Sequence, residues 1–207
     1  MRYCFVVGAP GSRWSGVANF LSESSAIDTG DHTEARQYFH KGLQKFRHFG
    51  SYFGPKLEFG DWFDQLNLRS KTEAELEFNR PWLDKPVTGI RIIKSHMFAY
   101  HLDYLRSAWP DCPIVLVYRP DQRCLDWWLN YGGFEITHPS YAWYRDVGTI
   151  SQHIAKQNSS IMHFANTLGL KFDLYDTADA CDRLHIPRPS RHIMSYGEMD
   201  IQVAVII

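Results

Sequence analysis

Three short apolar runs in this chain each end in a cluster of glycine or cationic residues. They are Tyr3–Val7 before Gly-Ala-Pro-Gly, Gly89–Ile93 before Lys94-Ser95-His96, and Ile114–Tyr118 before Arg119. Such runs, apolar throughout, are typical of strands covered on both faces. Helical patterns separate them, which predicts an α/β fold: a parallel β-sheet flanked by helices, with right-handed crossovers. Ligands bind at the carboxyl ends of the strands in such sheets.

Apolar residues recur at helical spacing between and after these runs, and they predict the covering helices. The segments are Ser15–Leu21, Thr33–Phe49, Tyr100–Ala108, Gln122–Asn130, Thr149–Leu168 and Thr177–Leu184, with weaker patterns over Trp62–Leu68 and Thr72–Phe78. Gly169 fits a C-cap of the longest helix. Leu170–Tyr175 is a candidate fourth strand. The alternating end, DIQVAVII, predicts an edge strand or a contact with another chain, so a homo-oligomer stays open.

Length, charge and composition restrict the functional class. A chain of 207 residues suits one domain, and its net charge of −1 argues against general nucleic-acid binding and a polybasic membrane surface. The first strand begins at once, which leaves no room for a signal peptide, so we expect a cytoplasmic protein with no membrane partner. The four cysteines lack CxxC spacing and are expected to be reduced thiols. The ten histidines form no HxH or HxxxH pair, which argues against a zinc site.

The segment Gly8–Ser15 links the first strand to a helix. Backbone N–H groups and the positive helix end converge in such a turn and hold phosphate or sulfate. Gly8 and Ser15 match the ends of the Walker pattern GxxxxGK[ST], but Arg13 replaces its second glycine and Trp14 its lysine. Arg13 either restores the missing charge or points to solvent. Trp14 either stacks on a purine or packs the loop against the sheet. The alternative is an ordinary glycine-rich turn.

The other two strand ends carry cations and no carboxylate, although Asp121 follows Arg119-Pro120 closely. Kinases and nucleotide hydrolases usually hold magnesium with an aspartate at a strand end. The sequence therefore predicts a site that works without a metal.

This combination of an N-terminal Gly-Ala-Pro loop, a strand ending in Lys-Ser-His and a strand ending in Arg resembles the sulfotransferases that use 3′-phosphoadenosine 5′-phosphosulfate (PAPS). The resemblance covers residues 3–19 and 89–128 and implies a P-loop-containing, sulfotransferase-like architecture. It implies that the 5′-phosphosulfate lies in the loop Gly8, Ala9, Pro10, Gly11, Ser12, Arg13, Trp14 and Ser15. Lys94 would be the phosphosulfate cation, His96 the catalytic base and Arg119 the 3′-phosphate ligand, with Arg123 also binding the nucleotide.

The implied reaction moves a sulfuryl group from PAPS to a hydroxyl or amine of a small-molecule acceptor and leaves adenosine 3′,5′-bisphosphate. Residues two apart in an extended segment face the same side, so Lys94 and His96 are expected to point together into the site. A histidine near its reference pKa of ~6.5 is largely neutral and can take the acceptor's proton. Residues 31–86 would be a helical, aromatic insertion within one domain, residues 1–207. It would shape the acceptor pocket with Tyr52, Phe53 and Glu58, a second candidate base.

The chain differs from the family pattern at four places. Gly11 stands where the family has Lys or Arg, Trp127 where it has a serine, and Pro120 follows Arg119 directly. A glycine-rich, lysine-bearing segment near the C-terminus has as its nearest counterparts Arg188, Arg191 and Tyr196-Gly197. Two other functions stay open: a magnesium-dependent P-loop kinase or hydrolase, and a non-catalytic nucleotide-binding module on a decayed sulfotransferase scaffold.

Overall fold

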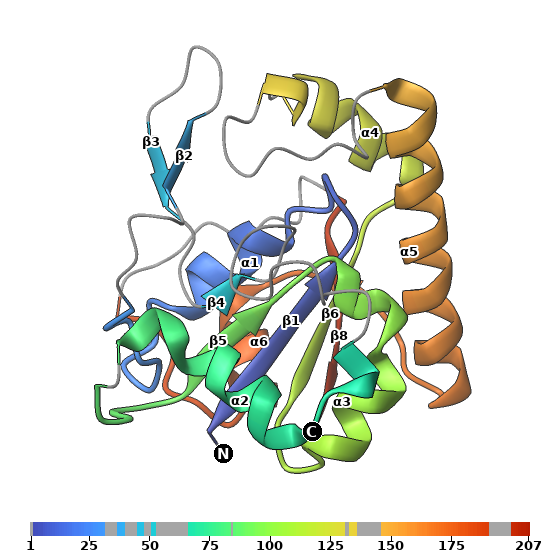
Figure 1. Cartoon of the computed structure of the whole chain (residues 1–207). Coiled ribbons are helices and arrows are strands. Elements are labelled where there is room, and N and C mark those ends of the chain that lie inside the picture. The colour runs from blue at the N-terminus through green and yellow to red at the C-terminus, as the bar shows by residue number, and fades with distance from the viewer. Residues whose placement is uncertain are drawn as a thin grey trace.

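The computed structural model describes residues 2–31, 66–83, 85–130, 133–135, 146–190 and 200–207, together with the backbone of three short strands at 37–39, 45–47 and 51–52. Within these ranges, six strands form one sheet in the order β4-β5-β1-β6-β8-β7 (Figure 1). Their bounds are β4 Ser51–Tyr52, β5 Arg91–Lys94, β1 Tyr3–Gly8, β6 Ile114–Tyr118, β8 Gln202–Ile206 and β7 Asp173–Leu174.

The three predicted core strands lie side by side in the sheet. β1 is central and pairs in parallel with β5 and β6, and β4 adds a further parallel strand beside β5. Their carboxyl ends therefore meet at one edge, shown at the top of Figure 1. The predicted parallel arrangement is confirmed for these strands.

The other side of the sheet differs from the prediction. β8 runs antiparallel to β6, and β7 runs antiparallel to β8, so the sheet is mixed. β8 also lies between β6 and β7, so the first of the two predicted alternatives, an edge strand, is not observed, and a contact with another chain stays a prediction. Alternation indicates that a segment is a strand, but it carries no information on strand direction or neighbours.

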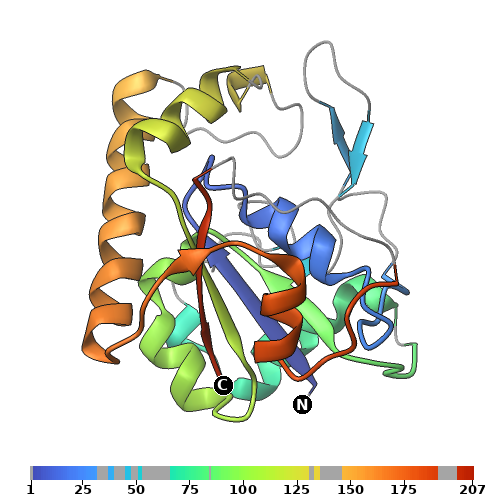
Figure 2. The same ribbon diagram turned by 180° about the vertical axis from the view of Figure 1, so that it is seen from behind.

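Helices cover both faces of the sheet (Figures 1 and 2). α1 (Trp14–Leu21) and α6 (Thr177–Arg183) pack on the face that carries Cys4 and Val6. α2 (Lys71–Asn79), α3 (Leu102–Ala108) and α5 (Val147–Thr167) contribute to the core on the face that carries Phe5 and Val7. This division follows from the alternation of side chains along a strand. α4 (Asp121–Asn130) lies at the carboxyl edge and contacts α5.

Most of the predicted helices are confirmed to within two or three residues. α5 begins after Asp146, whose side chain accepts a hydrogen bond from the Thr149 N–H. It ends just before Gly169, which has the positive φ of +64° expected of a helix-ending glycine. The predicted helix Tyr100–Ala108 is α3 preceded by the 3-10 turn η4 (Met97–Tyr100). Further 3-10 turns are η3 (Arg80–Trp82) and η5 (Gly133–Glu135).

The helix predicted over Thr33–Phe49 is wrong. This range contains β2 (Gln37–Phe39) and β3 (Lys45–Arg47), which pair antiparallel. Aromatic residues favour strands, and a glycine at position 42 weakens a helix interior, so local preference opposed the helical spacing. The rest of this range lies outside the described residues, as does most of the weaker helical pattern at Trp62–Leu68.

A buried ion pair fixes the amino end of β5, on the edge of the sheet opposite to the strand ends with Lys94 and Arg119. Arg91 Nε donates to Asp28 Oδ2 at 3.2 Å, and the two side chains are 3% and 4% exposed. Arg91 also donates to Asn79 Oδ1 at 2.6 Å and to the Lys85 carbonyl at 2.8 Å. Because every branch of this guanidinium is bonded within the protein, the pair is structural.

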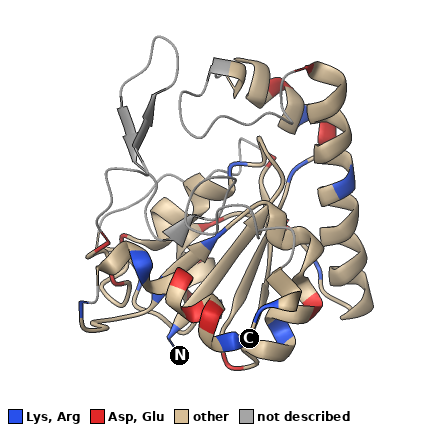
Figure 3. Cartoon of the chain, in the orientation of Figure 1, with Lys and Arg blue, Asp and Glu red and all other residues tan. Residues whose placement is uncertain are grey.

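Elsewhere, acidic and basic residues are interspersed along the described ribbon (Figure 3). All four cysteines are free thiols, as predicted. No helix in the described ranges combines the length and the apolar character needed to cross a membrane.

Candidate functional site

The loop between β1 and α1 depends on two glycines for its shape. A Cβ on Gly8 would lie 2.6 Å from Ser12 Oγ and 2.8 Å from Trp14 Cβ, so a side chain there would block the turn. Gly11 has a φ of +77°, and a Cβ on it would lie 2.0 Å from the Cys124 carbonyl oxygen on α4. The loop therefore closes tightly on itself and against α4.

Arg13 is the N-cap residue of α1 and has a left-handed backbone, with φ 72° and ψ 16°. This is the position at which the Walker pattern has its second glycine, so an arginine here adopts a glycine-like conformation at a cost of about 1–2 kcal/mol. Its guanidinium lies 3.9 Å from the ring centroid of Trp127, a cation–π contact. The side chain is thus held over the carboxyl edge by α4 and does not simply point to solvent.

Trp14 opens α1 and is 6% exposed. It belongs to the core on the α1 face, together with Val17 and Val117. Of the two sequence-based alternatives for this indole, packing of the loop against the sheet is therefore the one observed. The ring also lies 6.4 Å from that of His96, centroid to centroid, so the loop contacts the end of the neighbouring strand.

Lys94 is the last residue of β5, opposite Val6 of β1, and its side chain is fully buried. By alternation it follows Ile92 on the α1 face of the sheet. The strand ends at Lys94, so the argument that residues two apart in an extended segment face the same side does not reach His96, and their common direction stays a prediction. His96 has φ −68° and ψ −26° and begins the turn η4.

His96 is buried between the two faces of the sheet, with 2% of its surface exposed. Its Nδ1 lies 3.1 Å from Nε2 of Gln157 on α5. The pKa of His96 is lowered to about 3, chiefly by burial and also by nearby His153, while the Gln157 contact acts in the opposite direction. The expected pKa near the reference value is therefore wrong for the free protein, and the imidazole is neutral across the physiological range.

Arg119 follows β6 directly and is 8% exposed. Asn158 of α5 fixes its backbone, donating from Nδ2 to the Arg119 carbonyl at 2.8 Å and to Asp121 Oδ1 at 2.6 Å. The Cys124 thiol contacts the same carbonyl oxygen at 3.3 Å. These contacts hold the strand end rigidly beside the start of α4.

The Arg119 side chain is partly buried among charged groups of both signs. Its guanidinium is 5.7 Å from the Trp127 ring, and its Nε has no hydrogen-bond partner among the described residues. Burial lowers the pKa of Arg119 most; Cys124 and Asp200 act in the opposite direction, and the charges of Arg13 and Arg123 lower the pKa further. A bound anion would stabilise the charged form of this buried guanidinium.

Of the remaining predicted site residues, Arg123 lies beside Arg119, because its carbonyl accepts a hydrogen bond from Arg119 Nη1 at 3.2 Å. Arg123 forms an ion pair with Asp200 at 3.3 Å, and both side chains are more than half exposed. Tyr52 is described by its backbone alone, which pairs opposite Lys94 in β4. Phe53 and Glu58 lie outside the described residues, and so the predicted acceptor pocket stays a prediction.

Sequence reasoning missed two residues that touch the site. Gln157 and Asn158 are adjacent on α5, and both are buried, at 0% and 3% exposure. They interrupt the apolar stripe of α5 made by Ile150, Ile154 and Ile161. Two amides on the buried side of a long helix need polar partners, and this interruption was the signal available in the sequence.

Comparisons of the chain with protein-family models, with curated proteins and with solved structures found no match. No group of three or more His, Cys, Asp or Glu side chains suited to a metal ion occurs among the described residues.

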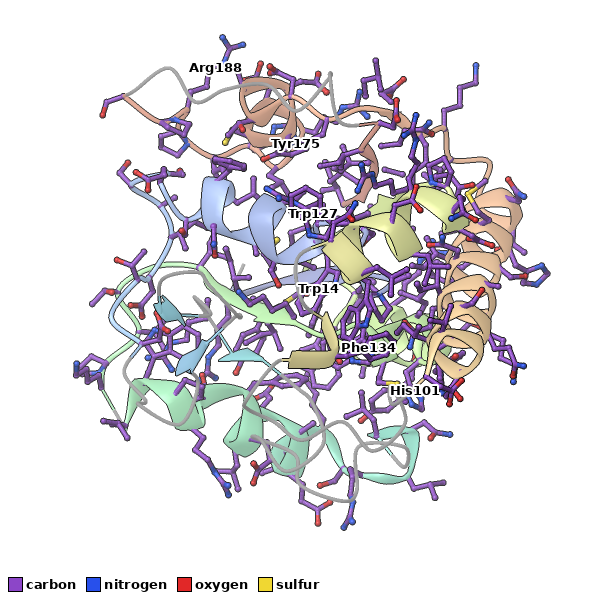
Figure 4. All side chains as sticks on the ribbon, turned by 90° about the horizontal axis from the view of Figure 1, so that it is seen from above. Trp14, His101, Trp127, Phe134, Tyr175 and Arg188 are labelled. Atoms are coloured by element: carbon purple, nitrogen blue, oxygen red, sulfur yellow. The ribbon has the colours of Figure 1, made fainter. Side chains whose placement is uncertain are left out.

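The described structure therefore brings cationic side chains together at the carboxyl edge of the sheet. Figure 4 looks down on this edge and labels Trp14 and Trp127, from α1 and α4. Arg13, the N-cap residue of α1, and Arg119 lie near the same Trp127 ring, and Lys94 ends the strand beside β1. The first turn of α1 carries no acidic residue. Such an arrangement suits a ligand with more than one negative charge, held beside the neutral imidazole of His96.

Proposed function

We propose that this chain is a sulfotransferase that transfers a sulfuryl group from PAPS to a hydroxyl or amine of a small acceptor without a metal. The observation that carries the proposal is that Lys94, His96 and Arg119 stand at or just after the carboxyl ends of the two strands that flank β1, which leads into the glycine-shaped loop. Three neighbouring parallel strands supply these residues and the loop. The donor suits this edge because it carries anionic groups at both ends of its ribose, and the cations stand at two strand ends.

In the proposed reaction, a new S–O bond or S–N bond forms to the acceptor while the S–O bond to the 5′-phosphate breaks. Negative charge then builds on the phosphate oxygen that leaves. Lys94 and the start of α1 stabilise that charge, because fixed cations and dipoles in a water-poor site act strongly on a developing anion. His96 takes the proton that the acceptor loses.

The low pKa of free His96 is compatible with this role. A neutral imidazole has a lone pair available to accept a proton, and a bound anionic donor raises the pKa of a neighbouring histidine. The donor would therefore strengthen the base when it binds. In the free protein the same group stays uncharged.

Arg119 and Arg13 carry the proposed 3′-phosphate contact. Both guanidinium groups lie near the ring of Trp127, at 5.7 and 3.9 Å. Trp127 occupies the place where the family has a serine. We propose that Arg13, supported on this indole, supplies the second contact in place of that hydroxyl.

Ligand-dependent thermal stability tests the proposal. Adenosine 3′,5′-bisphosphate at about 100 times its Kd should stabilise the protein by about 2.7 kcal/mol, whereas ATP with magnesium should not. Arg119→Ala should reduce the bisphosphate effect, and the control Arg106→Ala, on the exposed side of α3, should leave it unchanged. Stabilisation by ATP with magnesium alone would favour the kinase or hydrolase function. Bisphosphate binding without turnover on a panel of alcohols, phenols, sugars and amines would favour the non-catalytic module.

A further inference from the structure

The contact between Gln157 and His96 joins α5 to the end of β5. Both side chains are buried, and the two atoms involved, Gln157 Nε2 and His96 Nδ1, are 3.1 Å apart. No residue near Gln157 in the sequence belongs to the loop Gly8–Ser15 or to β5. The amide therefore reaches the imidazole through the tertiary fold alone, from the helix that also fixes Arg119 through Asn158.

A neutral imidazole carries one proton, on either Nδ1 or Nε2, and the partner of one nitrogen decides the state of the other. If the Gln157 amide nitrogen donates to Nδ1, the ring proton is on Nε2, and His96 donates from that atom. If the Gln157 carbonyl oxygen accepts from Nδ1–H, Nε2 keeps its lone pair. The two amide orientations have nearly the same shape and differ by a half-turn.

The surroundings of Gln157 leave both orientations accessible. Its Nε2 also lies 3.4 Å from the Met97 sulfur, which is a weak acceptor. Its Oε1 has no hydrogen-bond partner among the described residues. A half-turn gives that oxygen the Nδ1–H donor of His96, gives up a weak contact to sulfur, and moves the NH2 group to the place where Oε1 lies.

We propose that Gln157 is the positioning residue of His96: its Oε1 accepts the Nδ1 proton, so that the lone pair is on Nε2 and this atom accepts the proton of the acceptor. This inference rests on the proposed function for the role of Nε2, but the hydrogen-bond pattern belongs to the free protein. An amide suits the task because it selects the tautomer without bringing a negative charge into the buried site.

Nitrogen NMR of histidine-labelled protein tests the pattern directly, with the His96 signals identified by their loss in His96→Asn. The free wild-type protein should show His96 with its proton on Nδ1. Gln157→Glu, which can only accept at that position when ionised, should keep this tautomer and raise the pKa of His96. Gln157→Leu should lose the tautomer preference. The control Gln152→Leu makes the same change on the exposed side of α5 and should alter neither the tautomer nor the pKa of His96.

Kinetics supply the second readout. Gln157→Leu should lower kcat by ~10²-fold, the range for losing acid–base catalysis, with little change in the donor KM. Gln157→Glu should have most of the wild-type kcat, and the acidic limb of its pH–rate profile should move to higher pH. A wild-type His96 with its proton on Nε2, or a Gln157→Leu protein with the wild-type tautomer, overturns the proposal. Absence of bisphosphate binding, by contrast, would overturn the sulfotransferase function and leave the NMR result standing.

Discussion

Because Arg13 has a left-handed backbone, we expect its glycine variant to be more stable than its alanine variant, which reverses the order usual in a helix. Arg13→Ala removes the contact with Trp127, worth about 0.5–1 kcal/mol at a partly exposed site, and keeps the backbone strain. Arg13→Gly removes the same contact but also relieves about 1–2 kcal/mol of strain. Glycine gives back about 0.4–1 kcal/mol through the greater freedom of its unfolded chain. The glycine variant should therefore be more stable than the alanine variant by roughly 0.5–1 kcal/mol.

Urea unfolding of the two variants measures this difference, with equal m-values as the sign that the unfolded state is unchanged. The matched control is Lys156, which is exposed in the middle of α5. There Lys156→Ala should be more stable than Lys156→Gly by about 1 kcal/mol, because glycine disfavours a helix. If the Arg13 pair followed the order of the Lys156 pair, the left-handed conformation of Arg13 would be refuted. Bisphosphate affinity should fall equally in both Arg13 variants, since both lose the charge.

Three further predictions concern stability. Gly11→Ala should destabilise the fold by about 2–5 kcal/mol in urea unfolding, because a left-handed alanine is strained and its Cβ would overlap the Cys124 carbonyl; a loss below about 1 kcal/mol would contradict the loop geometry. Burial opposes ionisation of Asp28, but hydrogen bonds from the Gly30 N–H, Arg91 and Thr88 outweigh it and hold the pKa of this carboxyl below its usual value. Because the folded pKa of Asp28 is depressed, its contribution to the free energy of unfolding is complete above about pH 4 and is lost as the pH falls below that value. Asp28→Asn should cost about 3–5 kcal/mol at pH 7, because it leaves Arg91 partly unpaired. A neutral effect of this substitution in chemical unfolding would count against the ion pair. The folded pKa of His96 is also depressed, from 6.5 to about 3. The free energy of unfolding should therefore fall as the pH drops from 6.5 to 3, by up to about 1.4 kcal/mol per pH unit. His96→Asn should reduce this pH dependence in unfolding curves recorded between about pH 3 and 7.

The sequence by itself determined the parallel part of the sheet and the position of the strand ends. β6 matches its predicted bounds, and β1 and β5 match to within two residues, because an apolar run with glycine or charge at its end is a local signal. Consecutive strands of this kind joined by helices can pack as a parallel sheet with few alternatives. The sequence alone therefore places Gly8–Ser15, Lys94, His96 and Arg119 on one edge of the sheet.

Tertiary structure decided what surrounds those residues. The pKa of His96 depends on burial among α1, η4 and α5, and no local pattern reports how deeply a strand end is covered. The contacts of Gln157 and Asn158 join residues 61 and 39 positions apart. The direction of β8 depends on where the chain returns to the sheet. Spacing along a chain reports which face a side chain shares with its near neighbours, whereas burial, charge environment and hydrogen-bond partners arise when distant segments pack together.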